Sequence, residues 1–439
     1  MKQLLFPNNI QFWYETLRSM SHIAYGGADF GEVVSTAARI TESDYDSWYT
    51  EWFATAGRVS AEAEKALAAG HRVSARDGFL RASNYYRSAE FFLHGKDCDP
   101  RHDHAYDRSV ECFKAAAALY THPRIEPVLI PYENTTLPGY LYRGDDSGTP
   151  RPTLIMHNGF DGTAEELHFF GAMAAVERGY TVLAFDGPGM PGPRHHQGLV
   201  FRPDWENVIT PVIDFLETIP EVDNSRIALL GLSMGGVLAP RAAAFEHRLA
   251  AVIAVDGLYD LGQTSVRNIP GDREEAERLL RADSAPELDA AIDQIMAKDP
   301  IARWALNHGM YVMGVDTPPR LQRLLPRLHP RRRDRRADPV PHPCLRRRGG
   351  HVLPGPARAA LRPPHLPQDP HALHRRGRRR RPLPPRRHAS RQCPHLRLAR
   401  RHPRQHPPLT LTHPTAPHPA GHRREHPSVL RDPPKRRLR

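Results

Sequence analysis

The sequence has 439 residues, enough for two or three domains, and a formal net charge of +12. This average hides two unlike parts, because residues 1–320 hold 29 basic and 44 acidic side chains whereas residues 321–439 hold 32 basic and 5 acidic ones. No run of about 18 apolar residues occurs and the apolar start MKQLLF is too short for a signal peptide, so we expect neither a membrane segment nor secretion and predict a cytoplasmic location.

Residues 1–122 are predicted to form an all-helical domain. Alanine-rich patterns at Ser47–Ala69 and Val73–Leu93 place aromatic side chains at helical spacing, and His104–Tyr120 continues the pattern. We expect most of these aromatic side chains to pack between helices, with a minority lining a substrate pocket.

The pattern changes after Thr121, where residues 123–318 are predicted to form an α/β domain. Glu126–Tyr132 and Leu137–Arg143 predict an antiparallel strand pair. Short apolar runs then predict buried parallel strands at Thr153–Met156, Thr181–Phe185, Arg226–Leu230 and Ala251–Val255. Helical patterns occur at Thr163–Arg178, Pro203–Thr218, Met234–Glu246, Asp272–Met296 and Ile301–His308. The alternation predicts a doubly wound, mostly parallel sheet.

A glycine-rich motif, GLSMGG at Gly231–Gly236, follows one of these strands and precedes a helix. The first five residues fit the pattern G-x-S-x-G, in which a sharp strand-to-helix turn lifts a serine hydroxyl above the sheet. A chance pentapeptide in a turn is the competing interpretation, and the flanking elements argue against it. We predict that Ser233 is a catalytic nucleophile.

An acyl-transfer site also needs hydrogen-bond donors for the oxyanion. The segment MHNGFDG follows the first parallel strand, where such a hole is built, and the backbone N–H groups of Phe160 and Met234 are the candidates. We expect His157 in this segment to be structural rather than a general base. The loop AFDGPGMPGP at Ala184–Pro193 is expected to be a tight turn close to the pocket.

Taken together, HNGFDG, FDGPG, FRPDW at Phe201–Trp205, GLSMGG and the helical N-terminal region resemble a family of α/β-hydrolases. That family includes 2,6-dihydroxypseudooxynicotine hydrolase and the esterases related to the fermentation–respiration switch protein, and the resemblance covers about residues 5–318. It implies an α/β-hydrolase fold capped by the helical domain, and a Ser–His–Asp triad that uses neither a metal nor an organic cofactor. It also implies a homodimer that hydrolyses a small-molecule ester or a carbon–carbon bond beside a ketone.

A serine nucleophile needs a base, and the base needs an orienting carboxylate. In α/β-hydrolases both follow the serine, on loops after later strands, but here the strand-like sequence stops first. Asp256 ends the strand after the GLSMGG motif and is the reserve candidate for the acid, whereas His308 lies in a helical pattern. We therefore expect a sheet that is truncated on its C-terminal side and a chain that is inactive or crippled as written.

The last part of the chain, residues 319–439, is an Arg/Pro/His-rich tail. Residues 321–439 hold 31 Arg, 24 Pro and 14 His, but no Phe, Trp, Tyr, Ile, Met or Asn. Such a segment cannot bury enough apolar surface to offset the entropy of ordering it, so we predict disorder. One interpretation is a non-catalytic protein whose basic arm binds nucleic acid non-specifically through phosphates. The lack of aromatic side chains for base stacking argues against this interpretation.

The other interpretation is that the tail is read out of frame, from near Pro318–Arg320, in a GC-rich gene whose codons then supply Arg, Pro and His. Read one base later, Arg346–Arg362 is compatible with DAEEDMFFPGQPEQLYD and Arg386–Arg400 with GAMRLANARIFDWLD. Between them, Arg381–Pro385 is compatible with AHCHP. These sequences resemble the family's loop with the triad Asp, its last helix and its catalytic-histidine loop. We favour this interpretation.

Overall fold

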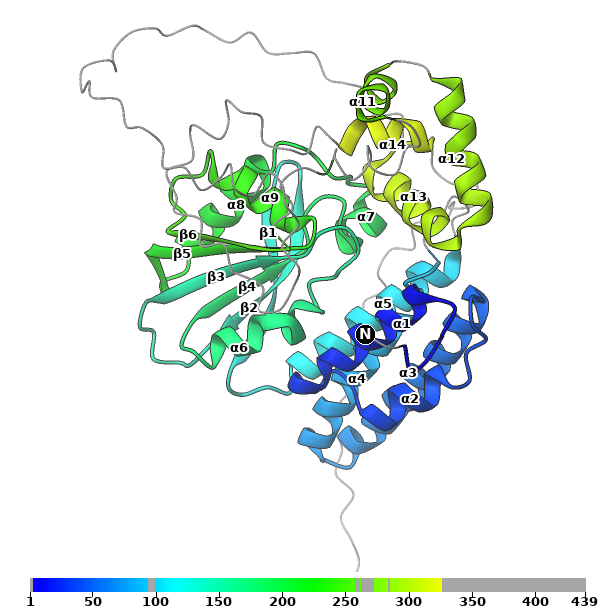
Figure 1. Ribbon diagram of the computed structural model, residues 1–439. Helices are drawn as coiled ribbons and strands as arrows, with labels where there is room; N and C mark the ends of the chain where they lie inside the picture. Colours follow the sequence, from blue (N-terminus) through cyan, green and yellow to red (C-terminus); the bar gives the residue numbers. More distant parts are fainter. Residues whose placement is uncertain (1–2, 94–98, 257–260, 262–271, 283–284, 326–439) are drawn as a thin grey trace, which may run out of the picture. The chain divides into compact units, whose positions relative to one another are not determined.

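The computed structural model describes residues 3–93, 99–256, 261, 272–282 and 285–325. Its N-terminal region is helical (Figure 1). Its helices are α1 (Ile10–Ser21), α2 (Phe30–Ala37), α3 (Tyr45–Ala68), α4 (Arg72–Glu90) and α5 (Pro100–Ala117), with a short 3₁₀ turn η1 (His22–Tyr25) after α1. Asp44 and Asp99 accept hydrogen bonds from backbone N–H groups in the first turns of α3 and α5, so their side chains fix where these helices begin. We call α1–α5 the helical region.

Aromatic side chains form the centre of the helical region. Trp48 and Trp52 are fully buried, and the Trp48 ring centroid lies 4.6 Å from that of Phe12 and 4.9 Å from that of Phe92. Tyr45 stacks on Phe92 at 4.8 Å. These rings join α1, α3 and the segment after α4, as expected for packing between helices.

A six-stranded mixed sheet forms the second part of the described chain. Its strands are β1 (Arg124–Tyr132), β2 (Thr135–Arg143), β3 (Arg151–His157), β4 (Thr181–Phe185), β5 (Val222–Leu232) and β6 (Ala251–Val255). They are arranged in the order β1-β2-β4-β3-β5-β6, with β1 and β2 antiparallel and the others parallel. The predicted strands and their pairing directions are confirmed, and among the described strands β6 lies at the edge.

The two faces of the sheet belong to different cores, because side chains alternate along each strand. Leu154 and Met156 of β3 pack in one cluster with the helical region, whereas Ile155 points to the other face. That second cluster holds α8 (Glu206–Glu217) and α9 (Gly235–Ala243). Helices therefore cover both faces, as expected for a doubly wound sheet.

The FDGPG and FRPDW segments pack on each other beside this second face. A Cβ on Gly187 would lie 2.7 Å from the ring of Trp205, and one on Gly189, where φ is 89°, would lie 2.3 Å from the ring of Phe201. Glycine is therefore required at both positions. The expected tight turn is present, and a helix that the sequence did not predict, α7 (Pro191–Gln197), follows it.

Two predicted helices differ from the observed ones. The pattern over Thr163–Arg178 yields only a π-helical turn η2 (His168–Ala172) and α6 (Met173–Val176), because Gly171 has a non-helical φ of 166°. The pattern over Asp272–Met296 is split into α11 (Arg273–Arg281) and α12 (Pro286–Lys298), because Pro286 cannot continue the preceding helix and starts a new one.

The expected disorder from residue 319 onward is wrong at its start. Helix α14 (Pro318–Leu324) crosses that boundary, with Pro318 in its first turn and Leu321 only 3% exposed. Leu321 packs against α13 (Pro300–Met313), where a Cβ on Gly309 would lie 2.5 Å from its side chain. The remaining tail, with the predictions of disorder and of a shifted frame, lies outside the described residues.

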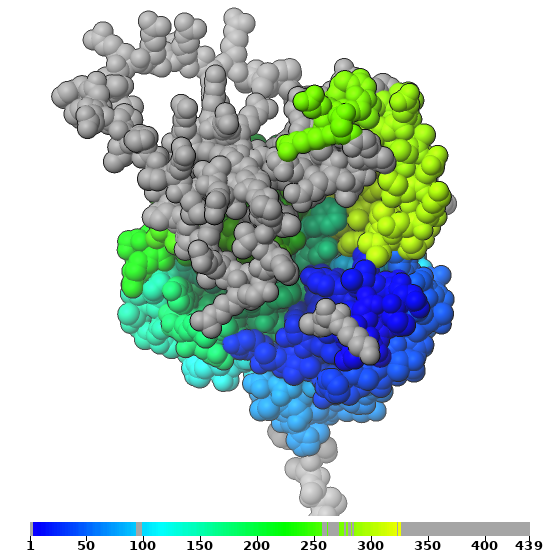
Figure 2. All heavy atoms as spheres, viewed as in Figure 1, coloured from blue at the N-terminus to red at the C-terminus, as the bar shows by residue number. Residues whose placement is uncertain are grey.

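The C-terminal helices also contact the helical region. Figure 2 shows α12 and α13 (yellow-green) beside the N-terminal helices (blue). The ring of Trp304 in α13 stacks on that of Phe91 with 4.7 Å between centroids, and its indole N–H donates to the Phe91 carbonyl. Within the described part of the chain, no helix combines the length and the apolar character needed to cross a membrane.

Candidate active site

Ser233 lies in the turn between β5 and α9 with a φ of 58°, in the left-handed region that non-glycine residues rarely adopt. Strained conformations of this kind persist only where the surroundings enforce them. Here the enforcement comes from close backbone contacts: a Cβ on Gly231 would lie 2.0 Å from the Gly235 carbonyl oxygen, and one on Gly235 would lie 2.5 Å from that of Asn158. The side chain of Ser233 stays exposed, above buried Met234.

The loop after β3 lies directly against this turn. A Cβ on Gly159 would lie 2.6 Å from the backbone nitrogen of Met234 and 2.7 Å from that of Gly235, so only glycine allows the approach. The loop is closed by Asn158, whose side-chain amide donates to the Thr163 carbonyl over 2.7 Å. Phe160 follows Gly159, so the loop with one predicted oxyanion donor borders Met234, which carries the other, at the N-terminus of α9. The N–H groups there lack partners within the helix.

His157 lies beneath the loop, fully buried against Trp205 and Phe185. Its Nδ1 lies 2.8 Å from the Asn158 carbonyl oxygen, and burial lowers the pKa of the imidazole to about 4. A neutral, enclosed ring that supports a backbone carbonyl is structural, as the sequence analysis expected.

A buried ion cluster ties the same loop to the helical region. Arg18 of α1 donates to both carboxylate oxygens of Glu166 over 2.7 and 2.6 Å and to Asp161 over 3.1 Å. Arg87 adds a 3.5 Å ion pair to Glu166. Burial alone would raise the pKa of Glu166, but the two guanidinium groups lower it to about 2. The carboxylate is therefore held charged, and the loop is anchored through it.

His308 reaches the loop from α13. Its Nε2 lies 2.7 Å from the Phe160 carbonyl oxygen, and its ring meets the Phe160 ring edge-on at 4.5 Å. A carbonyl oxygen only accepts, so this Nε2 carries the hydrogen and is occupied in supporting the loop. Within the described residues, no hydrogen bond joins the side chain of Ser233 to a histidine.

Asp256 lies at the end of the neighbouring strand. Leu232 of β5 pairs with Val255 of β6, and these adjacent parallel strands are spaced roughly 5 Å apart. Ser233 and Asp256 are the residues that directly follow them. Asp256 is exposed and has a φ of 72°. The structure thus brings the predicted nucleophile and the reserve acid to the same edge of the sheet.

The contacts that reach this site from remote elements were not predicted from the sequence. Arg18 lies 143 residues before Asp161, and His308 lies 148 residues after Phe160. No spacing rule covers such separations. The one local hint of a remote partner was Asp161, the acidic residue of HNGFDG, which accepts a hydrogen bond from Arg18.

Comparisons with known proteins agree with this fold. Residues 2–262 match the family model described as "Esterase FrsA-like". The chain is 37% identical to the hydrolase acrC of Aspergillus aculeatus, over 74% of this chain and 79% of that protein. It is 36% identical to the 20-hydroxy-prefusarin hydrolase FUS2 of Gibberella moniliformis, over 72% and 76% respectively. Among solved structures, 2,6-dihydroxy-pseudo-oxynicotine hydrolase has the same fold, with a TM-score of 0.57, 24% identity, and coverage of 74% and 79%.

Proposed function

Since the chain belongs to the FrsA-like esterase family of α/β-hydrolases, we propose that it is built as a serine hydrolase with Ser233 as the nucleophile. The observation that carries the proposal is the left-handed turn at Ser233, with the Gly159 backbone packed on the nitrogen of Met234. A strained serine at a helix N-terminus, beside a second loop of backbone donors, suits acyl transfer.

In the proposed reaction the Ser233 hydroxyl oxygen attacks the substrate carbonyl carbon, and the hydroxyl proton passes to a base. The carbonyl oxygen gains negative charge, which the N–H groups of Met234 and Phe160 stabilise together with the N-terminus of α9. The exposed hydroxyl of Ser233 is open to a substrate, and the supports of the loop at Asp161 and at the Phe160 carbonyl hold the donors in place.

The proposed substrate is a small-molecule ester, or a ketone whose adjacent carbon–carbon bond is cleaved. Both reactions begin with addition of the serine oxygen to a carbonyl, so one nucleophile and one oxyanion hole serve both. The description of the matched family as an esterase favours the ester.

We also propose that the chain as written lacks a positioned base, with Asp256 as the remaining candidate acid. The composition of residues 321–439 carries the related hypothesis that this arginine-rich tail is read out of frame. Nucleotide sequencing around codon 318 tests it directly, and a gene without the alternative frame would exclude it.

Turnover of a p-nitrophenyl ester tests the catalytic proposal. A chain with the frame restored should hydrolyse the ester, and Ser233→Ala should lower the rate by about 10⁴–10⁶-fold. The chain as written should resemble the Ser233→Ala variant. Near-normal activity of the chain as written, lost on Ser233→Ala, would instead assign the base to the described residues. Activity that survives Ser233→Ala in the restored chain would reject the nucleophile.

A further inference from the structure

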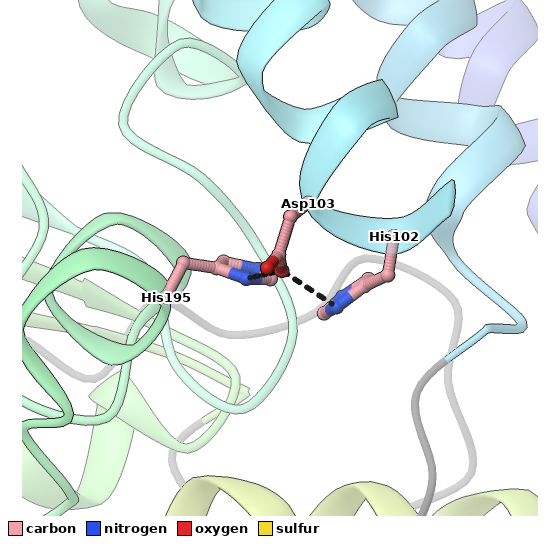
Figure 3. Close-up of side chains that lie close together, drawn as sticks. All are labelled: His102, Asp103 and His195. Atoms are coloured by element: carbon pink, nitrogen blue, oxygen red, sulfur yellow. Dashed lines mark hydrogen bonds and ion pairs between the residues drawn. The ribbon is translucent and has the colours of Figure 1, made fainter. Parts of the chain in front are cut away.

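Three side chains from two distant segments of the sequence converge at a second place in the structure. His102 and Asp103 lie in the first turn of α5, and His195 lies on α7; Figure 3 shows the carboxylate of Asp103 between the two imidazole rings. Asp103 Oδ1 lies 2.7 Å from His195 Nδ1 and 3.6 Å from His102 Nδ1. One nitrogen or oxygen from each of the three residues lies within 4.8 Å of the other two.

The surroundings orient this cluster. Glu90 at the end of α4, which is 1% exposed, places Oε2 3.0 Å from His102 Nε2, so the other ring nitrogen of His102 faces Asp103. A carboxylate behind one imidazole nitrogen is the usual arrangement for a histidine that binds a metal through the other. The hydroxyl of Tyr311 lies 3.3 Å from His195 Nδ1, which adds a further oxygen beside the cluster.

The two rings of the cluster are closely packed and almost fully enclosed. The rings of His102 and His195 lie only 4.2 Å apart, and their side chains are 7% and 1% exposed. Oδ1 of Asp103 thus faces one nitrogen of each ring. A divalent cation between them would satisfy both ring nitrogens and the carboxylate at once.

We propose that His102, Asp103 and His195 form a binding site for a divalent transition-metal ion of the Zn²⁺ class. Two imidazole nitrogens and one carboxylate suit such ions, whereas Mg²⁺ and Ca²⁺ prefer oxygen donors. In a tetrahedral zinc site with bonds of about 2.1 Å, neighbouring ligand atoms lie about 3.4 Å apart. This spacing falls between the 2.7 Å and 3.6 Å distances from Asp103 Oδ1 to the two histidine nitrogens. Small side-chain movements therefore close the site.

The ion would act as a structural clamp. It joins α5 of the helical region to α7, which follows the loop after β4, across 92 residues of sequence. The side chain of Asp103 is 55% exposed and gives the ion a path from solvent. The ion takes no part in the proposed serine chemistry, for which no metal is expected, so either proposal can fail without the other.

The experiment compares variants of the full-length chain, because the chain has 26 histidines and total metal uptake is uninformative. His195→Asn and Asp103→Ala remove one ligand each. His196→Asn and Asp107→Ala are matched controls beside the site. His196 Nε2 and Asp107 Oδ1 lie 3.1 Å apart in an exposed pair, which offers two groups rather than three. Co²⁺ binding is followed by calorimetry, and thermal unfolding by circular dichroism with and without Zn²⁺.

The unmodified chain and both controls should bind one more tight equivalent of Co²⁺ than His195→Asn and Asp103→Ala. Their unfolding midpoints should rise with Zn²⁺, because a ligand of the folded state stabilises it, whereas the ligand variants should not respond. Glu90→Gln should weaken the tight site by about 10- to 100-fold. Equal binding by all proteins, or an equal midpoint shift with Mg²⁺, would overturn the proposal. If His195→Asn fails to fold, Asp103→Ala decides, because that side chain is more than half exposed.

Discussion

The turn after β5 and the loop after β3 meet at the candidate active site, but different forces hold them. The turn at Ser233 is fixed by close backbone contacts, above all that between Gly231 and Gly235, which are four residues apart. The loop is fixed by charges and rings from far away, above all by Arg18 of α1. One half of the site is therefore local steric geometry, and the other half depends on how the helical region packs.

The largest expected effect comes from disrupting the backbone contacts of the turn at Ser233. Gly231→Ala places a Cβ 2.0 Å from the Gly235 carbonyl oxygen, so the turn must rebuild, and we expect a loss of about 4 kcal/mol or more in the free energy of unfolding. Gly148→Ala is the control: its φ is 68° but no atom lies within 4 Å, so it should cost about 1 kcal/mol. Urea unfolding measures both. Equal losses would show that the contacts around Gly231 are not what fixes the turn.

The supports of the loop are weakened by Arg18→Met, which leaves Glu166 buried beside Arg87 and the His22 ring, each 3.5 Å away. Loss of one partner from a buried ion pair costs about 3–5 kcal/mol. Hydrogen exchange should rise in the loop Asn158–Thr163 and stay unchanged in the turn around Ser233. Adding Glu166→Gln should recover part of the stability. Equal loosening of loop and turn would contradict the division drawn above.

Sequence reasoning succeeded where local rules apply. The strands, their order along the chain and the turn at Ser233 followed from apolar runs and glycine spacing, because hydrophobic periodicity and backbone sterics act over a few residues. The prediction of one helix over Thr163–Arg178 was wrong, because the backbone of Gly171 breaks it. The prediction that disorder begins at residue 319 was wrong as well, because the buried Leu321 extends a helix past the point where the composition becomes rich in Arg, Pro and His.

The remote supports could not be predicted, because nothing in a single sequence reports which distant charges become neighbours. Arg18 looks like any other basic residue on a helix face, and its partners lie 143 and 148 residues away. The same holds for His195, which is 92 residues from Asp103 on a helix that the sequence did not predict. Packing of the helical region on the sheet creates these contacts.

Acidification should destabilise the loop after β3 and its supports more than the turn at Ser233. Burial is the main cause that lowers the pKa of His22 and of His157 to about 4 and that of His168 to about 3, and all three lie in or near the loop and its supports. They stay neutral when folded and take up protons when unfolded, so their contribution is present above pH 6.5 and is lost as the pH falls toward 4. Each should cost about 2 kcal/mol by pH 5.

Glu15 works in the opposite direction, because burial raises its pKa to about 7 and its contribution is lost as the pH rises from about 4.5 through 7. Urea unfolding at several pH values should still show a net loss of stability between pH 6.5 and 4. His22→Gln should reduce the slope by about one proton. A slope unchanged by His22→Gln, or stability that rises on acidification, would contradict this assignment.

The smallest expected effect probes strain within the turn. Because Ser233 has a φ of 58°, Ser233→Gly should raise the free energy of unfolding by about 1 kcal/mol, whereas Ser233→Ala keeps the Cβ and should leave it nearly unchanged. A gain for glycine alone would show that the turn stores strain at the residue proposed to react. Equal stability of the two variants would place the strain elsewhere.

The most direct test of the central claim is to find which residue reacts as a nucleophile. The full-length chain is treated with a fluorophosphonate, which phosphonylates activated serines, and the adduct is located by peptide mass spectrometry. The account predicts one adduct, on Ser233, that is absent from Ser233→Ala and forms faster once the reading frame is restored. An adduct on a different residue, or none on Ser233 in the frame-restored chain, would contradict the proposal that this turn carries the reactive serine.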